Sequence, residues 1–386
     1  MPKPYLFKMK KEVIYLDSHA TTPVDQDVLS TMLPYFTEHY GNGNHKVGWK
    51  SNDAIENARF QVSNLIGSKP SEITFTSGAT EAINIALLGL ANSNTTNRNH
   101  IITQCTEHKA VLQCIKHLEH QGYRTTMLDV DQDGRIDINE LQQVVTDKTL
   151  VVAIMLVNNE IGTVQPIDEI GEITKKMGAM FFCDITQGIG WYSINMQNLN
   201  IDLAAMSAHK FYGPRGVGAL YIKKSNPKTN ISPIIFGGGQ EKELRPGTMN
   251  LPAIVGLGKA CELISSSLKS NHEEIREMRD RLQEQLFSSI NGIKLNGCPE
   301  NRHPGNLNIA IPNISGEQLK ELLPNVMFST TSACSSILSE QSHVLSAIGL
   351  DKNTSNCSFR LGIGKYNTIS EIDFVASKII GIANKA

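Results

Sequence analysis

The sequence predicts an α/β protein with a large domain on a mainly parallel sheet and a second, smaller α/β domain. Short apolar segments alternate with helical patterns between residues 72 and 223, which is the order of elements in α/β folds. Several of these segments, such as 150–157, are almost continuously hydrophobic, as expected for strands buried on both faces. The alternation of short apolar segments with helical segments stops after about Leu251. A chain of 386 residues is long enough to form two hydrophobic cores.

Seven segments have the composition of strands, and four segments between them have helical periodicity. Because helices connect many of the consecutive strands, most of the strands are expected to run parallel. In chain order, the predicted strands are 72–76, 100–104, 123–130, 149–157, 179–184, 202–207 and 217–223. The predicted helices are 80–91, 109–121, 138–146 and 167–177.

The C-terminal part begins with a long charged helix, which is expected over about 254–290 with a break near 266–269. Shorter strands and helices follow it to the end of the chain. We expect residues 18–255 to form the large domain. The small domain is expected to combine residues 1–17 with residues 256–386.

The composition excludes several classes of protein. With 40% hydrophobic and 19% charged residues and a net charge of −2, the chain is typical of soluble globular proteins and offers no basic field to nucleic acid or an anionic membrane. No apolar run reaches the length of a membrane span, and residues 1–11 lack the apolar core of a secretory signal. The seven cysteines form no C-x-x-C pair, which argues against disulfides and structural zinc. We expect a cytoplasmic protein without a bound metal, a membrane contact or directly bound nucleic acid.

A lysine and an aspartate follow two neighbouring predicted strands. Lys210 comes just after strand 202–207, and Asp184 ends strand 179–184. Ligands of open α/β sheets bind beyond the carboxyl ends of the strands, so the two side chains can meet there. A lysine amine forms the Schiff base that pyridoxal phosphate (PLP) requires, and a carboxylate keeps the pyridine nitrogen protonated. A surface lysine after a strand is the alternative interpretation of Lys210.

Residues 76–81 follow a strand and open a helix. Gly78 allows a tight turn, and the unpaired N–H groups at a helix N-terminus suit a phosphate. Ser207 and His209 could donate further hydrogen bonds to the same phosphate. The alternative is a plain N-cap made by a hydroxyl side chain of the same segment.

Residues 129–140 fit the pattern of an EF-hand loop. Acidic residues occupy its positions 1, 3, 5 and 12, and glycine occupies position 6. A calcium-binding protein is therefore the alternative from a different functional class. Residues 123–128 read as a strand where an EF-hand needs a helix, and no second hand exists. A strand–turn–helix connection, with Asp137 near the helix start, explains the same residues.

Several separated segments match motifs of one enzyme family, and they occur in that family's order and spacing over nearly the whole chain. They are 15–17, 20–24, 75–81, 106–111, 157–162, Asp184 with Gln187, 209–210 with 213–214, Arg245 with 247–248, 332–334 and Arg360. Each motif is modest, but their combination is specific. The chain thereby resembles the PLP-dependent cysteine desulfurases of the NifS/IscS type.

This resemblance implies an aminotransferase-like PLP fold (type I) and a homodimer. It also implies that the chain converts L-cysteine to L-alanine and transfers the sulfur as a persulfide for delivery to an acceptor protein. A related PLP enzyme, such as a selenocysteine lyase or an aminotransferase, is the nearest alternative, although an aminotransferase needs no loop thiol. A non-catalytic sulfur-transfer scaffold would need the loss of Lys210 or Asp184, and both are present.

The resemblance also implies roles for individual residues. Lys210 carries the cofactor, Asp184 holds the pyridinium nitrogen, and Gln187 donates to the phenolic oxygen. His108, which alone would be read as a surface histidine, stacks on the ring and helps to move protons. The phosphate and the substrate are held by the other implied residues: Ala79, Thr80, Ser207 and His209, Thr248 of the partner subunit, Asn159 facing the substrate, and Arg360 pairing with the substrate carboxylate.

Cys334 is the implied nucleophile. It lies in a run of small polar residues, 329–336, which suits a mobile loop that carries a thiol into a pocket. Cys298 also lies in a turn-like stretch, so the residues alone leave it as a rival, and the resemblance selects Cys334. The attacking species must be a thiolate, and His108 or the substrate itself would take its proton.

Two segments depart from the family's usual pattern. Residues 40–48 lack a proline and seem shortened, which puts substrate contacts from this loop in doubt. Ser18 and His19 replace the more usual residues before Ala20. Residues 236–248 look most like the branch that serves DNA phosphorothioation, and iron–sulfur cluster assembly and tRNA thiolation stay open as the other destinations of the sulfur.

Overall fold

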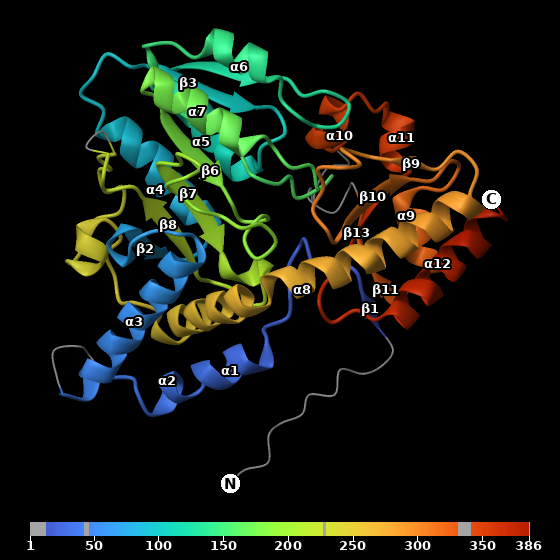
Figure 1. The fold of residues 1–386 in the computed structure, drawn as a ribbon, viewed down its shortest axis with the longest axis horizontal. Helices are drawn as coiled ribbons and strands as arrows, with labels where there is room; N and C mark the ends of the chain where they lie inside the picture. Colours follow the sequence, from blue (N-terminus) through green and yellow to red (C-terminus); the bar gives the residue numbers. More distant parts are fainter. Residues whose placement is uncertain (1–12, 42–45, 227–228, 331–340, 386) are drawn as a thin grey trace.

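The computed structural model describes residues 13–41, 46–226, 229–330 and 341–385. Within them the strands form sheets of seven, four and two strands. Figure 1 shows the seven-stranded sheet and its helices on one side, the smaller sheets with the C-terminal helices on the other, and one long helix crossing between them. The sheets and helices confirm the predicted α/β class.

The seven-stranded sheet has the order β2-β8-β7-β6-β5-β3-β4. Only β8 runs against the others, since it pairs antiparallel with both β2 and β7. The predicted strands are confirmed to within a few residues, except at the end of 149–157. The bounds are β2 Ile73–Thr76, β3 His100–Gln104, β4 Arg124–Leu128, β5 Thr149–Ala153, β6 Met180–Asp184, β7 Leu203–Ser207 and β8 Gly218–Ile222.

Helices cover both faces of this sheet, so its strands are buried on both sides. Along β5, Val151 belongs to the apolar cluster under α4 and α5, while Val152 belongs to the cluster on the opposite face. The four predicted helices between the strands are confirmed. Their bounds are α4 Ala79–Asn92, α5 Lys109–His120, α6 Ile138–Val144 and α7 Ile167–Met177.

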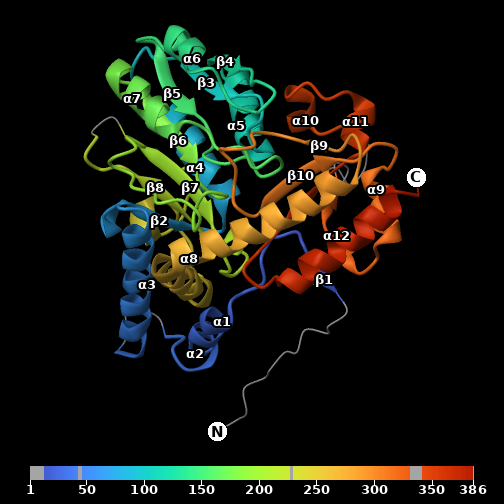
Figure 2. The same cartoon turned by 45° about the vertical axis from the view of Figure 1, so that its right-hand side comes forward.

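The long helix α8, Leu251–Ser289, joins the two parts of the molecule. It turns by 78° between 251–267 and 272–289, which agrees with the predicted break. Its first half packs against the N-terminal helices, and its second half runs beside the last helix of the chain (Figure 2). The N-terminal helices are α1 Gln26–Met32, α2 Pro34–Thr37 and α3 Lys46–Leu65.

The C-terminal part has its own apolar core and a four-stranded antiparallel sheet of order β12-β13-β10-β9. The N-terminal strand β1 joins this part, because it pairs with β11 in parallel. The predicted division at residue 255 falls inside α8 and stays a prediction. The bounds are β1 Ile14–Tyr15, β9 Lys294–Leu295, β10 Asn306–Ala310, β11 Val326–Met327, β12 Ser329–Thr330, β13 Ser358–Gly362, α9 Gly316–Leu322, α10 His343–Ala347, α11 Lys352–Asn356 and α12 Ile369–Ala383.

The apolar run 149–157 continues past the end of β5 at Ala153 with hydrogen bonds on one side only. The N–H groups of Ile154 and Leu156 still donate to Phe182 O and Asp184 O of β6. The N–H of Met155 donates at 2.6 Å to the buried side chain of Glu107. The sequence could not show this, because the partner is 48 residues away.

No single helix among the described residues has both the length and the apolar character of a membrane span. Only the two halves of α8, taken together across their bend, meet those criteria.

Candidate active site

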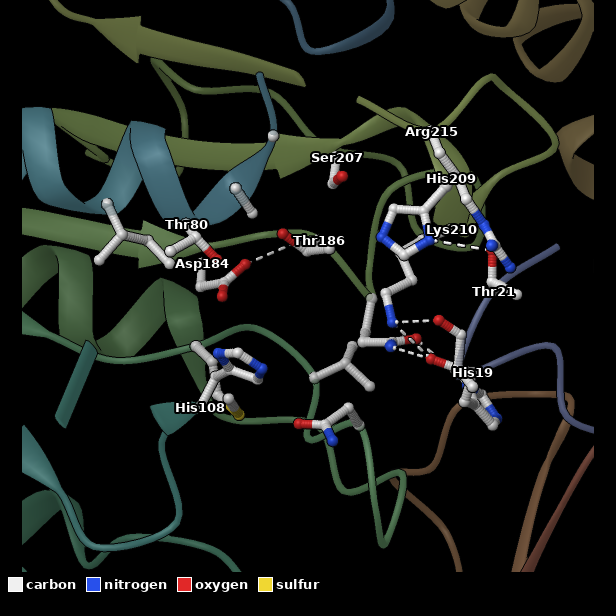
Figure 3. A pocket seen from close by; sticks show the side chains of 18 of the residues that line it. His19, Thr21, Thr80, His108, Asp184, Thr186, Ser207, His209, Lys210 and Arg215 are labelled. Carbon is white, nitrogen blue, oxygen red and sulfur yellow. Dashed lines mark hydrogen bonds between the residues drawn. The ribbon is translucent and has the colours of Figure 1, made fainter. Parts of the chain in front are cut away.

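A cavity of about 730 Å³ opens at the carboxyl ends of β6 and β7 (Figure 3). The start of α4, the N-terminal segment 17–21 and strand β13 complete its walls. The structure brings most of the predicted site residues together here. Those that line the cavity are Ala79, Thr80, His108, Asn159, Asp184, Gln187, Ser207, His209, Lys210 and Arg360.

Lys210 reaches the cavity because a single 3₁₀ turn, 208–210, follows β7 directly. Its Nζ donates to the carbonyl oxygens of His19 at 2.7 Å and Ala20 at 2.9 Å. The lysine is half-buried and lines the cavity, so the alternative of a plain surface lysine is wrong. Its amine is therefore anchored by acceptors of the N-terminal segment.

Asp184 is the last residue of β6 and lines the same cavity as Lys210. The N–H of Thr186 donates to its Oδ1 at 2.9 Å and fixes the orientation of the carboxylate. The side chain is buried, at 7% exposure. A buried, oriented carboxylate suits a protonated ring nitrogen as its partner.

The N-terminus of α4 faces the cavity without a side-chain cap. Its N-cap is Gly78, with φ at +152°, and no side chain accepts from the first N–H groups. The alternative of a plain hydroxyl N-cap is therefore wrong. A Cβ added to Gly218 of β8 would lie 2.3 Å from Met206 O and 2.7 Å from Gly78 Cα, so this close approach requires glycine.

Several further donors surround that helix end. Ser207 Oγ lies 3.5 Å from where a Cβ on Gly78 would stand. His209 Nδ1 is 3.0 Å from Thr21 Oγ1, which also accepts from Arg215 Nε at 3.3 Å. Burial, with help from Lys210 and Arg215, lowers the pKa of His209 to about 4, so its ring is neutral at pH 7.

This set of groups fits PLP. Uncapped backbone N–H groups, a hydroxyl, a neutral imidazole and a guanidinium are the donors that a phosphate needs. Asp184 and Lys210 supply a carboxylate and an amine in the same cavity. Sequence reasoning missed Arg215, although its position five residues after Lys210 was a usable signal.

Arg360 is the most constrained cation of the site. It lies on β13, an inner strand, with 8% of its surface exposed. Its Nη1 donates to Asn159 O at 2.6 Å, and its Nη2 donates to Asp17 Oδ1 at 2.6 Å and to Ser329 Oγ at 2.8 Å. Its buried Nε has no hydrogen-bond partner among the described residues. The guanidinium is therefore buried and held by three acceptors, so Arg360 is not a solvated edge charge.

His108 caps α5, and its Nδ1 accepts from the N–H of Ala110 at 3.1 Å. A neutral ring that accepts at Nδ1 carries its proton on Nε2. Burial, Lys210 and His343 lower the pKa of His108, although the side chain is accessible to solvent through the cavity. The ring is therefore a neutral group that can exchange a proton within the cavity.

Glu107 is a buried acid just behind His108. Its Oε1 accepts from Met155 N at 2.6 Å and from Gln104 Nε2 at 2.7 Å, while Oε2 is buried without a partner. Burial raises the pKa of Glu107 to about 8 against the effect of these two hydrogen bonds. The side chain is therefore protonated at neutral pH.

We expect Glu107→Gln to remove a pH dependence of stability. The pKa of Glu107 is about 8 in the folded state, above its ordinary value of 4.5. Between these values the unfolded chain has lost the proton that the folded chain keeps, so wild-type stability falls as pH rises through this window. An amide retains both hydrogen bonds and cannot ionise. Chemical unfolding at pH 5.5 and 8 should show a loss on the order of a few kcal/mol in the wild type that the variant lacks; parallel losses would contradict this.

Cys334 and its neighbours 331–340 lie outside the described residues. The flanks of this segment reach the site: Ser329 lines the cavity, and His343 Nε2 is 3.0 Å from Glu107 O. None of the described cysteines lines the cavity. The rival Cys298 is buried elsewhere, with its N–H donating to Thr163 Oγ1.

Two other predicted features lie apart from the cavity. Thr248 is exposed and does not line the cavity of its own chain, so its role in the partner subunit stays a prediction. Residues 129–140 form a connection from β4 to α6, in which Asp137 caps α6. Asp131 accepts from backbone N–H groups within its own turn, and the described residues contain no group of three or more metal-ligating side chains that could hold an ion.

Comparisons with known proteins agree with this geometry. The model of the aminotransferase class-V family matches residues 14–375. The cysteine desulfurase IscS of Rickettsia bellii is 42% identical over 375 residues, which cover 96% of this chain and 91% of that protein. The solved structure of a NifS-like protein superposes with a TM-score of 0.90 at 37% identity, covering 97% of this chain and 100% of that one. SspA in complex with cysteine gives a TM-score of 0.81 at 33% identity, covering 92% and 100%.

Proposed function

This chain belongs to the class-V aminotransferase family and is a PLP-dependent cysteine desulfurase that acts on L-cysteine, and we propose here roles for individual residues of its cavity. The observation that carries the proposal is the meeting of an amine, a carboxylate, a set of phosphate donors and a guanidinium in one cavity. These groups come from segments far apart in the sequence.

Three groups of cavity residues would bind three parts of the cofactor: its phosphate, its ring nitrogen and its aldehyde carbon. Ser207, His209, Arg215 and the start of α4 would hold the phosphate. Asp184 would pair with the ring nitrogen, and Lys210 would provide the covalent attachment. When bound, PLP supplies an electron sink conjugated with the substrate nitrogen, which allows bonds at the substrate Cα and Cβ to break.

The substrate's reacting atoms would lie between Lys210 and Arg360. The carboxylate of L-cysteine would accept from the guanidinium of Arg360, which lines the cavity. The amine of Lys210 would remove the proton from the substrate Cα. Its starting position is fixed by the carbonyls of His19 and Ala20.

Cys334 is the thiol to which we assign the sulfur. The chain has seven cysteines, and the six in the described residues lie away from the cavity. Burial raises the pKa of several of them, including Cys114 and Cys183, which makes them poor thiolates. Cys334 follows Ser329 by five residues, a span of at most roughly 18 Å when extended, so its thiol can reach the cavity. The thiolate would attack the substrate sulfur as the substrate Cβ–S bond breaks, and L-alanine would leave once Cβ has taken up a proton and Cα has regained the one that Lys210 removed.

His108 is the group we assign to proton exchange beside the cofactor. Its neutral ring carries a proton on Nε2, as its bond to Ala110 N requires. The lowered pKa keeps it able to accept a proton from the Cys334 thiol or to pass one on.

A homodimer would complete the site with Thr248 of the partner subunit. The N-terminal helices support this, because Leu33, Phe36, Trp49 and Phe60 are exposed apolar side chains on or between α1, α2 and α3. Such exposure is typical of a surface that another protein covers. A cytoplasmic location stays a prediction from the cysteine content.

The persulfide would pass to an acceptor protein. DNA phosphorothioation, iron–sulfur cluster assembly and tRNA thiolation are the destinations that the sequence predicts, with residues 236–248 favouring the first. Phe236, 85% exposed, lies in this segment and offers a contact for an acceptor or for the partner subunit.

The test is a single-turnover reaction of the PLP-loaded protein with L-cysteine in the absence of reductant. We expect one L-alanine per active site and one extra sulfur atom on the peptide that contains Cys334, measured by mass spectrometry. Pyruvate and ammonia in place of alanine, or sulfur on another cysteine, would contradict the assignment. Light scattering of the same sample should give twice the mass of one chain.

A further inference from the structure

His19 contacts two groups of the proposed site at once. Its ring Nδ1 lies 3.2 Å from Gln187 Oε1, and its carbonyl oxygen accepts from Gln187 Nε2 at 2.9 Å. The same carbonyl accepts from Lys210 Nζ at 2.7 Å. The residue lines the cavity with only 3% of its surface exposed (Figure 3).

These contacts leave one orientation for the Gln187 amide. A peptide carbonyl can only accept, so the nitrogen of the amide must face His19 O. The oxygen Oε1 must then face the ring, and Nδ1 of His19 must carry the ring proton in order to donate to it. One hydrogen of Gln187 Nε2 is used by His19 O, which leaves the second for the cavity that Gln187 lines.

The packing around the ring preserves this arrangement. The His19 ring meets the His303 ring edge-to-face, with centroids 4.4 Å apart, and His303 meets Trp191 at 4.9 Å. A Cβ added to Gly362 of β13 would lie 3.0 Å from His19 Cδ2, so the strand leaves room for the ring only as glycine. The cations that face it, Arg360 and Lys210, oppose a second ring proton, and with burial they lower the pKa of His19 to about 3. The ring therefore stays neutral and donates from Nδ1.

We propose that the His19 side chain is a positioning residue that locks the Gln187 amide with its N–H toward the phenolic oxygen of the bound cofactor. This inference rests on the proposed function, because it takes Gln187 as the partner of that oxygen. Without the ring N–H, Oε1 loses its donor and only the carbonyl of His19 still orients the amide, so the N–H is held toward the phenolic oxygen less firmly. A residue at position 19 that merely fills space would have no such effect.

The readout is the pH midpoint of the absorbance change of the lysine-bound cofactor. An N–H donor makes the phenolic oxygen less basic, so the proton shared between that oxygen and the lysine nitrogen is released at lower pH. Losing the donor should raise the midpoint by about one pH unit, the size expected for one hydrogen bond to a charged oxygen. This midpoint is independent of turnover.

Four variants test the inference. Gln187→Ala removes the donor itself and should raise the midpoint by about one unit. His19→Phe keeps a ring of similar size against His303 but removes Nδ1, and it should raise the midpoint in the same direction by at most that amount. His19→Asn places an amide nitrogen where Nδ1 was, and it should retain the wild-type midpoint. The double variant His19→Phe/Gln187→Ala should show no further rise, because both changes act on the same donor.

The outcomes separate this inference from the proposed function. If Gln187→Ala shifts the midpoint and His19→Phe does not, the cofactor site stands and the role of His19 is wrong. Additive shifts in the double variant would also overturn it. If His19→Phe fails to fold, a midpoint in His19→Asn that matches Gln187→Ala contradicts the inference by itself. If the protein binds no cofactor through Lys210, the proposed function fails first.

Discussion

Lys210→Ala should abolish turnover of L-cysteine and the covalent attachment of PLP together. The lysine is proposed both to attach the cofactor and to move the substrate proton, and no other lysine of the described residues lines the cavity. Loss of a positioned base alone costs a factor of about 10²–10⁴, so loss of both roles should lower alanine formation by at least ~10⁴-fold. Alanine release and the visible absorbance of the bound cofactor measure the two roles.

Two further variants make the Lys210 result specific. Lys210→Arg keeps a cation near the carbonyls of His19 and Ala20, but a guanidinium stays protonated and forms no Schiff base, so it should be as inactive as Lys210→Ala. Lys320→Ala removes an exposed lysine of α9 and should leave the rate unchanged. Alanine release by Lys210→Ala within tenfold of the wild-type rate would contradict the assignment of Lys210 as the catalytic lysine.

Cys334→Ser should stop sulfur transfer while leaving the cofactor in place. A serine hydroxyl is not ionised near neutral pH, whereas the reaction needs a thiolate, so we expect alanine formation to fall by more than about a hundredfold. The absorbance of the bound cofactor should still change when L-cysteine is added, because substrate binding uses Lys210, Asp184 and Arg360 rather than the thiol. Stopped-flow absorbance and alanine release separate the two events.

Cys298→Ser is the matched control for that experiment. Cys298 is the rival from sequence and is buried away from the cavity, so the change should lower the free energy of unfolding by about 1 kcal/mol and leave the rate within twofold. If Cys334→Ser kept the wild-type rate and Cys298→Ser were inactive, the nucleophile would be Cys298 and not Cys334.

Local patterns in the sequence were sufficient for the elements of the large sheet. Strands such as 100–104 and helices such as 167–177 are found with the predicted bounds, because their apolar periodicity is set by the faces they bury. The predicted end of strand 149–157 was wrong: β5 ends at Ala153, and the N–H of Met155 beyond it donates to the side chain of Glu107, 48 residues away. A prediction from local periodicity cannot include a hydrogen-bond partner that is so distant in the sequence.

The candidate site also combines residues that local sequence predicts with residues that only distant contacts bring into place. Lys210, Asp184 and the α4 turn were found because each follows a strand, and strand ends share one edge of the sheet. Arg215 and His19 were not assigned to the cavity, because their roles depend on side-chain contacts with Thr21 and Gln187. No spacing rule connects positions 19 and 187.

The order of chemical groups along the chain, and with it the family and the reaction, was determined by the sequence alone. The tertiary structure decided which nitrogen of an imidazole donates, which way an amide faces and which acceptors hold the arginine of the site. The physical reason is that periodicity and strand ends are local properties of the chain. Hydrogen-bond direction and pKa depend instead on burial and on groups that only folding brings within 3 Å.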